Sequence, residues 1–568
     1  MCSTADRCWA SPRNNQRLNQ TSPQEQTTSQ SRAHRKNPRL SHPTESAFLG
    51  RFILSLLIFI VNLVLFTLFL SVVILVVPVC FFTRKLILYF SIRHYRDGKL
   101  SKMSACEAVW LQASCVNTAP MSNVFFLFEG RITIDELENF VKNKLVHQEM
   151  LLGNLRLLKL KQSPVPILTG YGWEEVDNLN VNNCVFEFRG NSSLNPEDLK
   201  QINEMSNFFG GEKLWRAVLF PKFHGSEDTG VLFQMHESIA DMFPFVRIVL
   251  NSLDYKTVFL KRQCFFLGRL ASYLFASFTG PLVILKRLLM TRQEDFCGTD
   301  HERGPHNSAD DTFQVYWSGP IDFKSVKRIK DVTRTEVDII LLSCVAGAIR
   351  SFLQKSKILY PDDVRVCIRT DVRPQHSRLK LDNKFSMAFI KLPVGTEGAV
   401  PRLWETRRRI DNFSFTLEST IMYGFIKLCL LLFPLSVVRS LINYLLNKVS
   451  CTVTQIPGPN MPVYMNGKMT KMMTCWTPRK TQNGLSVSIT NHSGQIYVGL
   501  VTRHSQINDP SLLLADFERE VADLGNHLGK RALPSHLRWR LKVDQQLVNA
   551  VNEERERGER EALENELV

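Results

Sequence analysis

A long apolar run near the N-terminus limits most strongly how this chain can fold. From Phe52 to Phe82 the sequence is almost entirely Leu, Ile, Val and Phe, and Asn62 is its only strongly polar side chain. A helix needs roughly 20 apolar residues to cross a bilayer core. The run is too long and too far from the N-terminus for a secretory signal peptide. We therefore predict a membrane anchor over residues 48–90, either a single tilted span or a tight hairpin turning near Asn62 or Pro78.

The charge pattern favours a membrane surface over nucleic acid as the partner. The formal net charge is +16, but Lys and Arg form no stripe; their local excesses, at 32–51 and 84–102, flank the apolar run. Basic flanks beside an apolar span fit an anionic lipid surface. No zinc-finger, basic-zipper or RNA-recognition motif is present. Because the two flanks are nearly equal, the positive-inside rule does not orient the anchor.

The rest of the chain predicts an α/β protein in two lobes. Residues 1–47 are polar, lack a hydrophobic period and should be disordered. Mixed α/β patterns follow over 100–293 and 313–545, separated by a polar linker at 294–312, and residues 546–568 form a charged tail. The 13 cysteines include no C-x-x-C pair, so we expect reduced thiols facing the cytosol and no metal site.

Two further segments are unusually apolar. Phe265–Met290 and Phe425–Leu446 each carry scattered basic residues, such as Lys427 and Arg439. Charges inside these segments argue against full membrane spans. Three interpretations stay open: a helix lying in the membrane interface, a helix lining an acyl tunnel, or ordinary helix packing.

A polar cluster stands at a predicted strand-to-helix connection. Trp215–Phe220 and Val231–Met235 read as paired strands, and Pro244 opens a helix whose apolar stripe runs to Leu253. Between them the chain reads His236, Glu237, Ser238, Ile239, Ala240, Asp241. A histidine near an aspartate is weak evidence by itself, and a hydrogen-bonded structural histidine is the plain alternative.

The order of strand, His-x-x-x-x-Asp and helix resembles the His-His-x-x-x-Asp-Gly motif of the wax ester synthase/diacylglycerol acyltransferase (WS/DGAT) family. Non-ribosomal peptide condensation domains carry a related motif. Other segments resemble the family in the same order, together covering roughly residues 100–525: Met103–Trp110, Lys213–Trp215, Val345–Arg350, Asn383–Phe385, Leu392–Val394, Thr454–Pro459, Gly484–Ser488 and Gly494–Val501.

The resemblance implies a fold, a reaction and a set of site residues. The fold would have two chloramphenicol-acetyltransferase-like lobes with a central tunnel. The reaction would join a fatty acyl group from acyl-CoA to an alcohol, with a general base removing the hydroxyl proton and donors stabilising the oxyanion. The second histidine of the motif would be the base, and the aspartate would hold the loop by pairing with an arginine. The substrate-binding residues would be Trp215, Asn383, Pro457 and Gly458, although Ile456–Pro459 also reads as a plain turn.

The motif of this chain departs from the family at the base. His236 matches the first histidine, Glu237 the second, Asp241 the aspartate and Met242 the glycine; the family's Asn-Asp pair becomes Asp338-Ile339. Adjacent side chains of an extended segment point to opposite faces, so His236 cannot simply replace position 237. Glu237 acts as the base if burial makes it a stronger one. Otherwise His236 swings in from a loop that is not extended, or the chemistry has been lost.

Two functions therefore remain open. The first is a membrane-bound O-acyltransferase that makes wax ester or triacylglycerol from acyl-CoA and a long-chain alcohol or diacylglycerol, with no cofactor besides this co-substrate. The second is an inactive, membrane-anchored lipid-binding or regulatory protein on the same fold. In either case we expect a protein of the endoplasmic reticulum or plasma membrane with its lobes facing the cytosol.

Overall fold

A computed structural model gives the arrangement of most of the chain. It describes residues 48–94, 100–111, 120–146, 158–168, 170–175, 183–188, 214–223, 226–253, 266–291, 313–373, 380–411, 415–477, 485–503, 507 and 509–529. The predicted disordered N-terminus at 1–47, the linker at 294–312 and the tail at 546–568 lie outside these residues. The chain divides into two units, Met1–Phe59 and Ile60–Val568, and the second unit holds every sheet described below.

The N-terminal apolar run forms one helix, α1 (Phe48–His94), which continues through Asn62 and Pro78. A hairpin turn at either residue is therefore wrong. Two helices in the described chain are long and apolar enough to cross a membrane: residues Phe52–Ser91 of α1, whose most apolar window is 6% buried, and α8 (Val337–Lys355), at 72%. Because α8 lies in the protein core, α1 alone remains a membrane candidate within the described residues.

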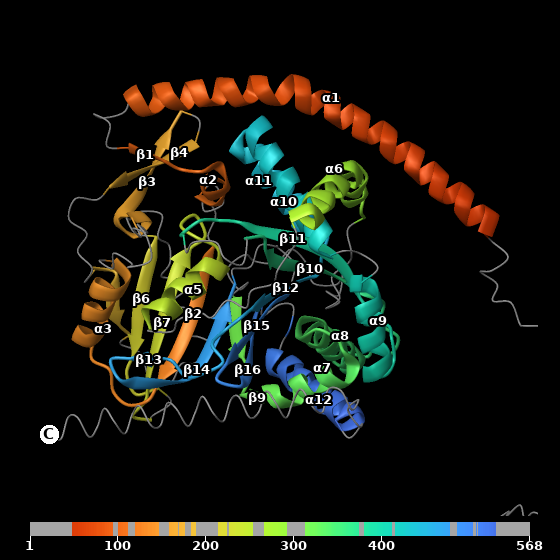
Figure 1. Cartoon of the computed structure of the whole chain (residues 1–568). Helices are drawn as coiled ribbons and strands as arrows, with labels where there is room; N and C mark the ends of the chain where they lie inside the picture. The colour runs from red at the N-terminus through yellow and green to blue at the C-terminus, as the bar shows by residue number, and fades with distance from the viewer. Residues whose placement is uncertain are drawn as a thin grey trace, which may run out of the picture. The chain divides into compact units, whose positions relative to one another are not determined.

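The fold is α/β and is built on two large sheets (Figure 1). One is six-stranded, in the order β13 (Tyr464–Met465), β14 (Lys468–Trp476), β2 (Met121–Phe128), β7 (Thr229–His236), β6 (Trp215–Phe220) and β5 (Val185–Glu187). The other is seven-stranded, in the order β11 (Phe385–Leu392), β10 (Val364–Asp371), β12 (Cys451–Ile456), β15 (Leu485–His492), β16 (Gln495–Arg503) and β8 (Phe313–Trp317), with β9 (Ile321–Asp322) also on β16. The paired strands predicted at Trp215–Phe220 and Val231–Met235 are confirmed as β6 and β7.

The two sheets exchange a segment of chain. Strand β14 comes late in the sequence, yet it pairs antiparallel with β2, aligning Trp476 with Asn123 and Thr470 with Phe128. The sequence placed residues 464–476 in the C-terminal lobe, whereas this pairing places them in the sheet of the N-terminal half. An apolar cluster including Phe125, Val218 and Trp476 packs between the sheets, against Val315 of β8.

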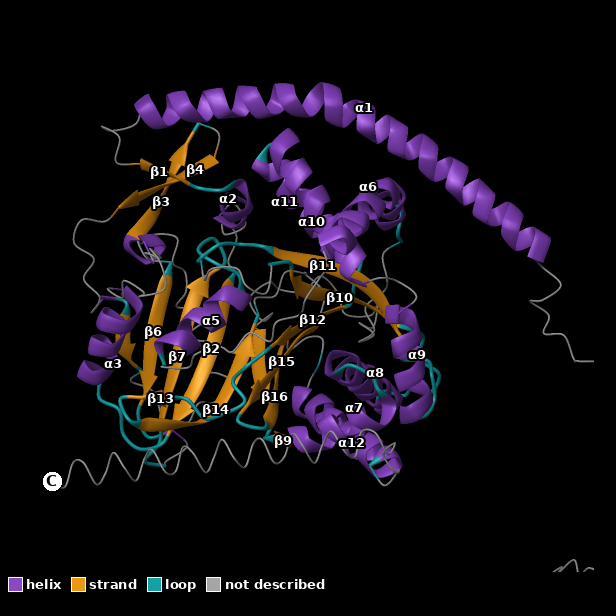
Figure 2. Ribbon diagram, in the orientation of Figure 1, coloured by secondary structure: helices purple, strands orange, loops and turns teal. Residues whose placement is uncertain are grey.

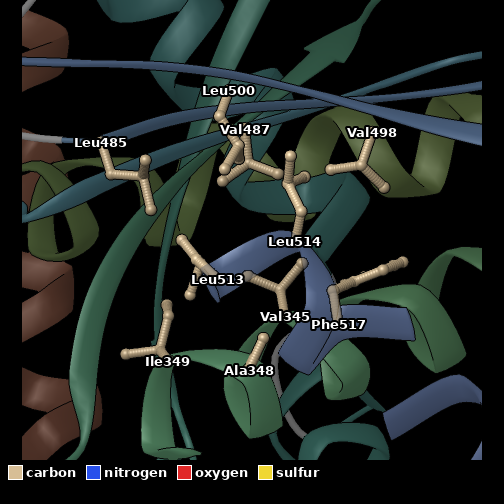
Figure 3. Close-up of a pocket in the computed structure, with 10 residues that line it drawn as sticks. All are labelled: Val345, Ala348, Ile349, Leu485, Val487, Val498, Leu500, Leu513, Leu514 and Phe517. Carbon is tan, nitrogen blue, oxygen red and sulfur yellow. The ribbon is translucent and has the colours of Figure 1, made fainter. Parts of the chain in front are cut away.

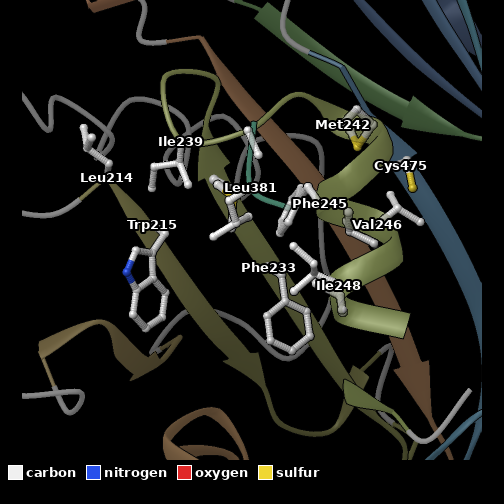
Figure 4. Close-up of a cluster of buried hydrophobic side chains, with 14 of the residues drawn as sticks. Leu214, Trp215, Phe233, Ile239, Met242, Phe245, Val246, Ile248, Leu381 and Cys475 are labelled. Carbon is white, nitrogen blue, oxygen red and sulfur yellow. The ribbon is translucent and has the colours of Figure 1, made fainter. Parts of the chain in front are cut away.

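Helices cover the sheets where the hydrophobic pattern requires it (Figure 2). Helix α5 (Met242–Ser252) packs its apolar side on the six-stranded sheet, where Phe245 and Val246 join Phe233 of β7 (Figure 4). Helices α8 and α12 (Pro510–Leu528) share a second core with the seven-stranded sheet, next to α7 (Phe323–Thr333) and α9 (Ala399–Asp411). These helices fix the sheets in place around the connection that carries the motif.

Smaller elements complete the description. The predicted capping box begins α3 (Ile134–Phe140): Thr133 accepts from the Glu136 amide, and the Glu136 carboxylate accepts from the Thr133 amide. The remaining elements are α2 (Ala105–Leu111), η4 (Val141–Val146), η5 (Leu158–Lys161), α6 (Phe266–Leu288), α10 (Phe415–Leu432), α11 (Leu435–Leu446) and a three-stranded sheet of β1 (Leu100–Lys102), β4 (Gly170–Glu175) and β3 (Gln162–Ile167). Each cysteine that the structure describes is a free thiol.

One cavity lies in the second core, lined only by apolar side chains of α8, α12, β15 and β16 (Figure 3). Its volume of about 10 Å³ is no larger than one water molecule requires. It is therefore a packing defect between helices and sheet, and the central tunnel expected from the resemblance stays a prediction.

Candidate functional site

The predicted motif lies where β7 ends and α5 begins. His236 is the last residue of β7 and aligns with Met121 of β2. The chain then turns, and backbone hydrogen bonds tie this turn to its surroundings: the Glu237 amide donates to the Pro120 carbonyl at 3.0 Å, and the Ile239 amide to the His236 carbonyl at 3.0 Å. All three predicted catalytic residues, His236, Glu237 and Asp241, are buried within it.

Asp241 holds the connection to both lobes. Its carboxylate accepts from the Phe243 amide at 3.0 Å, which makes it the N-cap of α5, and from the Lys384 amide at 2.8 Å. It also accepts from both terminal nitrogens of Arg373, at 2.6 and 3.3 Å. The resemblance implied an arginine partner for this aspartate, and the structure identifies it as Arg373, just beyond β10.

The Arg373 guanidinium remains charged although it is buried. Burial alone lowers its pKa, but the charge of Asp241 and their hydrogen bonds, followed by the charges of Asp371 and Asp382, raise it above the ordinary value. Asp371 and Asp382 lie 3.0 and 2.8 Å from this guanidinium. Arg373 therefore fastens the motif of one sheet to the chain that follows β10 of the other.

Glu237, at the position of the family's base, forms a second ion pair across the lobes. Its Oε1 lies 2.8 Å from a terminal nitrogen of Arg369 on β10, and both side chains are almost fully buried. Asn383 donates to the Glu237 carbonyl at 2.9 Å. A guanidinium stabilises the ionised carboxylate, so this pairing opposes the protonation that burial alone would favour. Glu237 is thus one half of a buried ion pair that joins the two sheets.

His236 is held in an orientation unsuited to the role of a base. The Ser238 amide donates to its Nδ1 at 3.1 Å, and the Ser238 hydroxyl lies 2.7 Å from the same atom. Because a backbone amide can only donate, Nδ1 is the accepting nitrogen, and Nε2 carries the hydrogen of the neutral ring. Burial lowers the pKa of His236 to about 4, against a smaller raising effect from Glu237. The alternative in which His236 swings in is not the arrangement seen.

A third arginine stands near Glu237. Arg439 of α11 stacks on the ring of Trp110, with 4.9 Å between its guanidinium carbon and the ring centroid. Burial lowers its pKa, while the charge of Glu237 raises it. Its Nη1 is buried and has no hydrogen-bond partner among the described residues. Arg369 and Arg439 are thus two cationic side chains close to the Glu237 carboxylate.

The residues expected to contact substrate divide into three groups. Trp215 is a core residue. Its indole donates to the Leu160 carbonyl at 2.9 Å, and its ring packs in the apolar core that the six-stranded sheet shares with α5 (Figure 4). Asn383 touches the motif itself through the Glu237 carbonyl. Pro457 and Gly458 follow β12, which runs parallel to β10 with Thr454 beside Arg369. Whether any of them binds substrate stays a prediction.

Gly458 is constrained by its neighbour Asn491. Its amide donates to the Asn491 side chain at 2.7 Å, and a Cβ added to Gly458 would lie 1.8 Å from the Asn491 carbonyl oxygen. This amide is therefore engaged in joining β12 to β15, which agrees with the interpretation of Ile456–Pro459 as a structural turn. Nearby, Gln455 donates to the carbonyl of Asp338 at 2.8 Å, and burial raises the pKa of Asp338.

Sequence reasoning missed the three arginines because each is far from the motif along the chain. Arg369 and Arg373 are separated from their acidic partners by 132 residues. Arg439 had a weak signal, since it is a charge within an apolar segment. No group of three His, Cys, Asp or Glu side chains able to hold a metal occurs among the residues that the structure describes.

Comparison with known proteins agrees with the C-terminal part of the resemblance. Residues 381–525 match the family model named WS/DGAT C-terminal domain. A probable diacylglycerol O-acyltransferase, tgs1, of Mycobacterium tuberculosis is 24% identical over 210 residues, which are 36% of this chain and 44% of that protein. A putative diacylglycerol O-acyltransferase of Mycobacterium bovis matches to the same extent. The chain thus spans less than half the length of these curated relatives, and its motif at 236–241 lies outside the family model.

Solved structures give likenesses of low identity. A wax ester synthase/diacylglycerol acyltransferase from Marinobacter aquaeolei VT8 is 14% identical, with a TM-score of 0.49 over 76% of this chain and 100% of that chain. The starter condensation domain of rhizomide synthetase is 11% identical, with a TM-score of 0.47 over 77% and 95% of the two chains.

Proposed function

Since this chain belongs to the WS/DGAT family through its C-terminal domain at residues 381–525, we propose that it is a membrane-bound O-acyltransferase. The reaction transfers a fatty acyl group from acyl-CoA to a long-chain alcohol or to diacylglycerol, giving wax ester or triacylglycerol. The mycobacterial relatives bear the name diacylglycerol O-acyltransferase, which supports this acceptor class. No cofactor is needed, because acyl-CoA is itself a substrate.

Glu237 is the base in this proposal. Its carboxylate takes the hydroxyl proton of the acceptor, the acceptor oxygen bonds to the thioester carbon, the carbon–sulfur bond breaks, and the proton passes to the departing CoA sulfur. Arg369, 2.8 Å away, favours the ionised form of the Glu237 carboxylate, which is the form that accepts a proton. The same ion pair weakens the base, and slow turnover is the expected consequence.

Arg439 supplies the opposing charge. A tetrahedral intermediate carries negative charge on the former carbonyl oxygen, and a preorganised cation in a dry site stabilises it. Arg439 is partly buried, is held over the ring of Trp110 and lies near the charge of Glu237. Asp241 and Arg373 keep the connection in place while the proton moves.

The single observation that carries the proposal is the position of Glu237. It lies on the β7–α5 connection of one sheet and is paired with β10 of the other sheet, at the residue that matches the family's base. A lipid substrate lying between the lobes would meet this carboxylate. Acyl-CoA is a cytosolic donor, so the lobes should face the cytosol, at the endoplasmic reticulum or the plasma membrane.

The same ion pair favours a second function. A carboxylate neutralised by Arg369, beside a histidine whose Nδ1 accepts from Ser238, suits a scaffold that binds lipid without turnover. In that case the chain is a membrane-anchored lipid-binding or regulatory protein. Both functions predict acyl-CoA binding, and only the first predicts an ester product.

One assay separates these functions. Purified full-length chain in detergent is given radiolabelled palmitoyl-CoA with hexadecanol or with dioleoylglycerol, and labelled ester is measured by thin-layer chromatography. The control is the double variant Glu237→Ala, His236→Ala, with acyl-CoA binding measured in parallel. We expect ester above the control level. Acyl-CoA binding with no ester above that level would overturn the acyltransferase and favour the binding protein.

A further inference from the structure

One face of α1 is shielded along most of its length. Between Ile60 and Ser91 the residues that are not exposed recur at intervals of three or four, apart from the adjacent pair Leu65 and Phe66, and so lie on one side of the helix. These residues, here called the seam, are Asn62, Leu65, Phe66, Phe69, Val73, Val77, Cys80, Arg84, Leu88 and Ser91. A helix standing free of the body would show no such face.

Two contacts join the seam to the body, one near each of its ends. The ring of Phe66 lies edge-on to that of Phe278 in α6, with centroids 5.5 Å apart. Eighteen residues later, Arg84 donates to the carbonyls of Leu430 and Phe433, at the end of α10, with 2.7 Å to the Phe433 oxygen. These carbonyls are the groups that a helix C-terminus leaves without partners. The hydrogen bonds of Arg84 to them, here called the Arg84 clasp, are therefore a specific contact between α1 and the body.

The length of the seam is incompatible with a conventional span. From Asn62 to Ser91 a helix rises about 43 Å, while the hydrocarbon core of a bilayer is about 30 Å thick. If α1 crossed the bilayer upright, the body beside the seam would lie in hydrocarbon. The helices concerned carry an ion pair between Arg287 of α6 and Glu418 of α10, 2.6 Å apart, and belong to an α/β body with polar loops. Such a body belongs in water.

The other side of α1 is apolar and exposed. Val61, Leu68, Leu75 and Phe82 recur every seven residues on the side away from the seam, and each is about half exposed or more. An interfacial helix normally has a polar face because one side meets water. Helix α1 needs none, because the body covers one side and lipid can cover the rest.

The body adds apolar surface of its own beside the two contacts. On α6, Tyr273, Leu274 and Phe275 are exposed five to three residues before Phe278. At the corner between α10 and α11, Phe433 and Val437 are exposed next to the Arg84 clasp. Contiguous exposed apolar patches on a folded body mark sites of membrane or protein contact.

We propose that α1 lies along one leaflet of a phospholipid bilayer instead of crossing it, and that α6 and the α10–α11 corner enter the same leaflet beside it. This placement rests on the proposed membrane-bound function and specifies it further. Long-chain alcohols and diacylglycerol dissolve in that leaflet, and α11 carries Arg439 beside the candidate base. The acceptor then reaches the site from the leaflet, and the donor from the water phase.

Fluorescence depth measurements test the placement. A fluorescent amino acid is introduced singly at Val61, Leu68, Leu75 or Phe82 of the full chain, which avoids the native cysteines. The variants are reconstituted in phosphatidylcholine–phosphatidylserine vesicles, and quenching by shallow and deep nitroxide lipids gives each probe's depth. Neighbouring positions are about 10 Å apart along the helix. We expect similar depths at all four; depths that change by about 10 Å per step through the bilayer centre would overturn the proposal.

Two tyrosines provide a matched pair on the body. Tyr273 of α6 is 60% exposed, and Tyr360, beyond the end of α8, is 91% exposed. A probe at Tyr273 should be quenched by the shallow lipid, and one at Tyr360 by neither. Equal quenching at the two sites would contradict the placement of α6 at the membrane surface. Unquenched probes throughout α1 would mean that a second copy or another protein covers it, overturning the bilayer as partner while leaving the ester assay unaffected.

Discussion

Two acidic residues of the β7–α5 connection, Glu237 and Asp241, each form an ion pair with an arginine of the opposite lobe. The other hydrogen-bond partners of the two residues differ. Asp241 pairs with Arg373 and also accepts from the backbone amides of Phe243 and Lys384. Glu237 pairs with Arg369, four residues before Arg373, and Asn383 donates to the backbone carbonyl of Glu237. The Asp241 carboxylate thus binds two backbone amides as well as an arginine, whereas the Glu237 carboxylate binds the side chain of Arg369.

The difference suggests a division of labour between structure and chemistry. A carboxylate committed to a helix cap and a second lobe cannot leave its partners without loss of fold. A carboxylate held by a side chain can exchange that contact for a substrate hydroxyl. The four predictions below test this division, starting with the largest effect.

Asp241→Asn should lower the free energy of unfolding by about 3 kcal/mol, because it keeps the cap but removes the most deeply buried of the three carboxylates that face Arg373. Denaturant unfolding followed by circular dichroism measures this loss. Glu405→Gln is the control: Glu405 pairs with Arg408 on the surface of α9, and such pairs contribute less than about 1 kcal/mol. If the free energy of unfolding fell no more in Asp241→Asn than in the control, the structural role of Asp241 would be contradicted.

Glu237 and Arg369 should be coupled by about 2 kcal/mol in a double-mutant cycle of Glu237→Gln and Arg369→Gln. Either single change breaks this pair and leaves one buried charge without the other, and the double change removes both charges. Unfolding free energies of the four proteins give the coupling. Additivity within about 0.5 kcal/mol would mean that the 2.8 Å pair is not maintained in solution.

His236 should make the protein less stable in acid. Its folded pKa of about 4 lies below the value of about 6.5 in an unfolded chain, so the unfolded state binds the proton first as pH falls. The contribution of His236 to the free energy of unfolding is therefore fully present above pH 6.5. It is lost progressively towards pH 4, and the loss is about 2 kcal/mol at pH 5. Unfolding between pH 7 and 5 should show a shallower loss in His236→Gln than in the wild type; equal slopes would contradict the buried neutral ring.

Asn383→Ala should have the smallest effect, a loss of about 1 kcal/mol, because it removes one hydrogen bond to the Glu237 carbonyl. The Michaelis constant for acyl-CoA is measured on the same variant. A raised constant with unchanged stability would favour the original interpretation of Asn383 as a substrate-binding residue.

Local features were predicted well from the sequence. The Thr133–Glu136 capping box, the strand ending at His236 and the helix opening near Pro244 depend on residues a few positions apart, and each is present. The resemblance added that Asp241 would meet an arginine. It could not say which one, because the pairing depends on how two sheets dock.

Non-local features were beyond sequence reasoning. Strand β14 joins β2 across more than 340 positions of chain, and its own pattern does not reveal which sheet it enters. The same limit hid Arg369, which changes Glu237 from an isolated carboxylate into half of an ion pair. The seam of α1 was hidden because most of its residues are as apolar as those facing outward.

The turnover of Glu237→Gln tests the central claim most directly. It is compared with wild type and Glu237→His in the palmitoyl-CoA assay, with circular dichroism confirming that each protein is folded. Loss of a general base lowers turnover by a factor of roughly 100 or more. We predict a loss of that size in Glu237→Gln and ester formation retained in Glu237→His. Wild-type turnover in Glu237→Gln would contradict the assignment of Glu237 as the base.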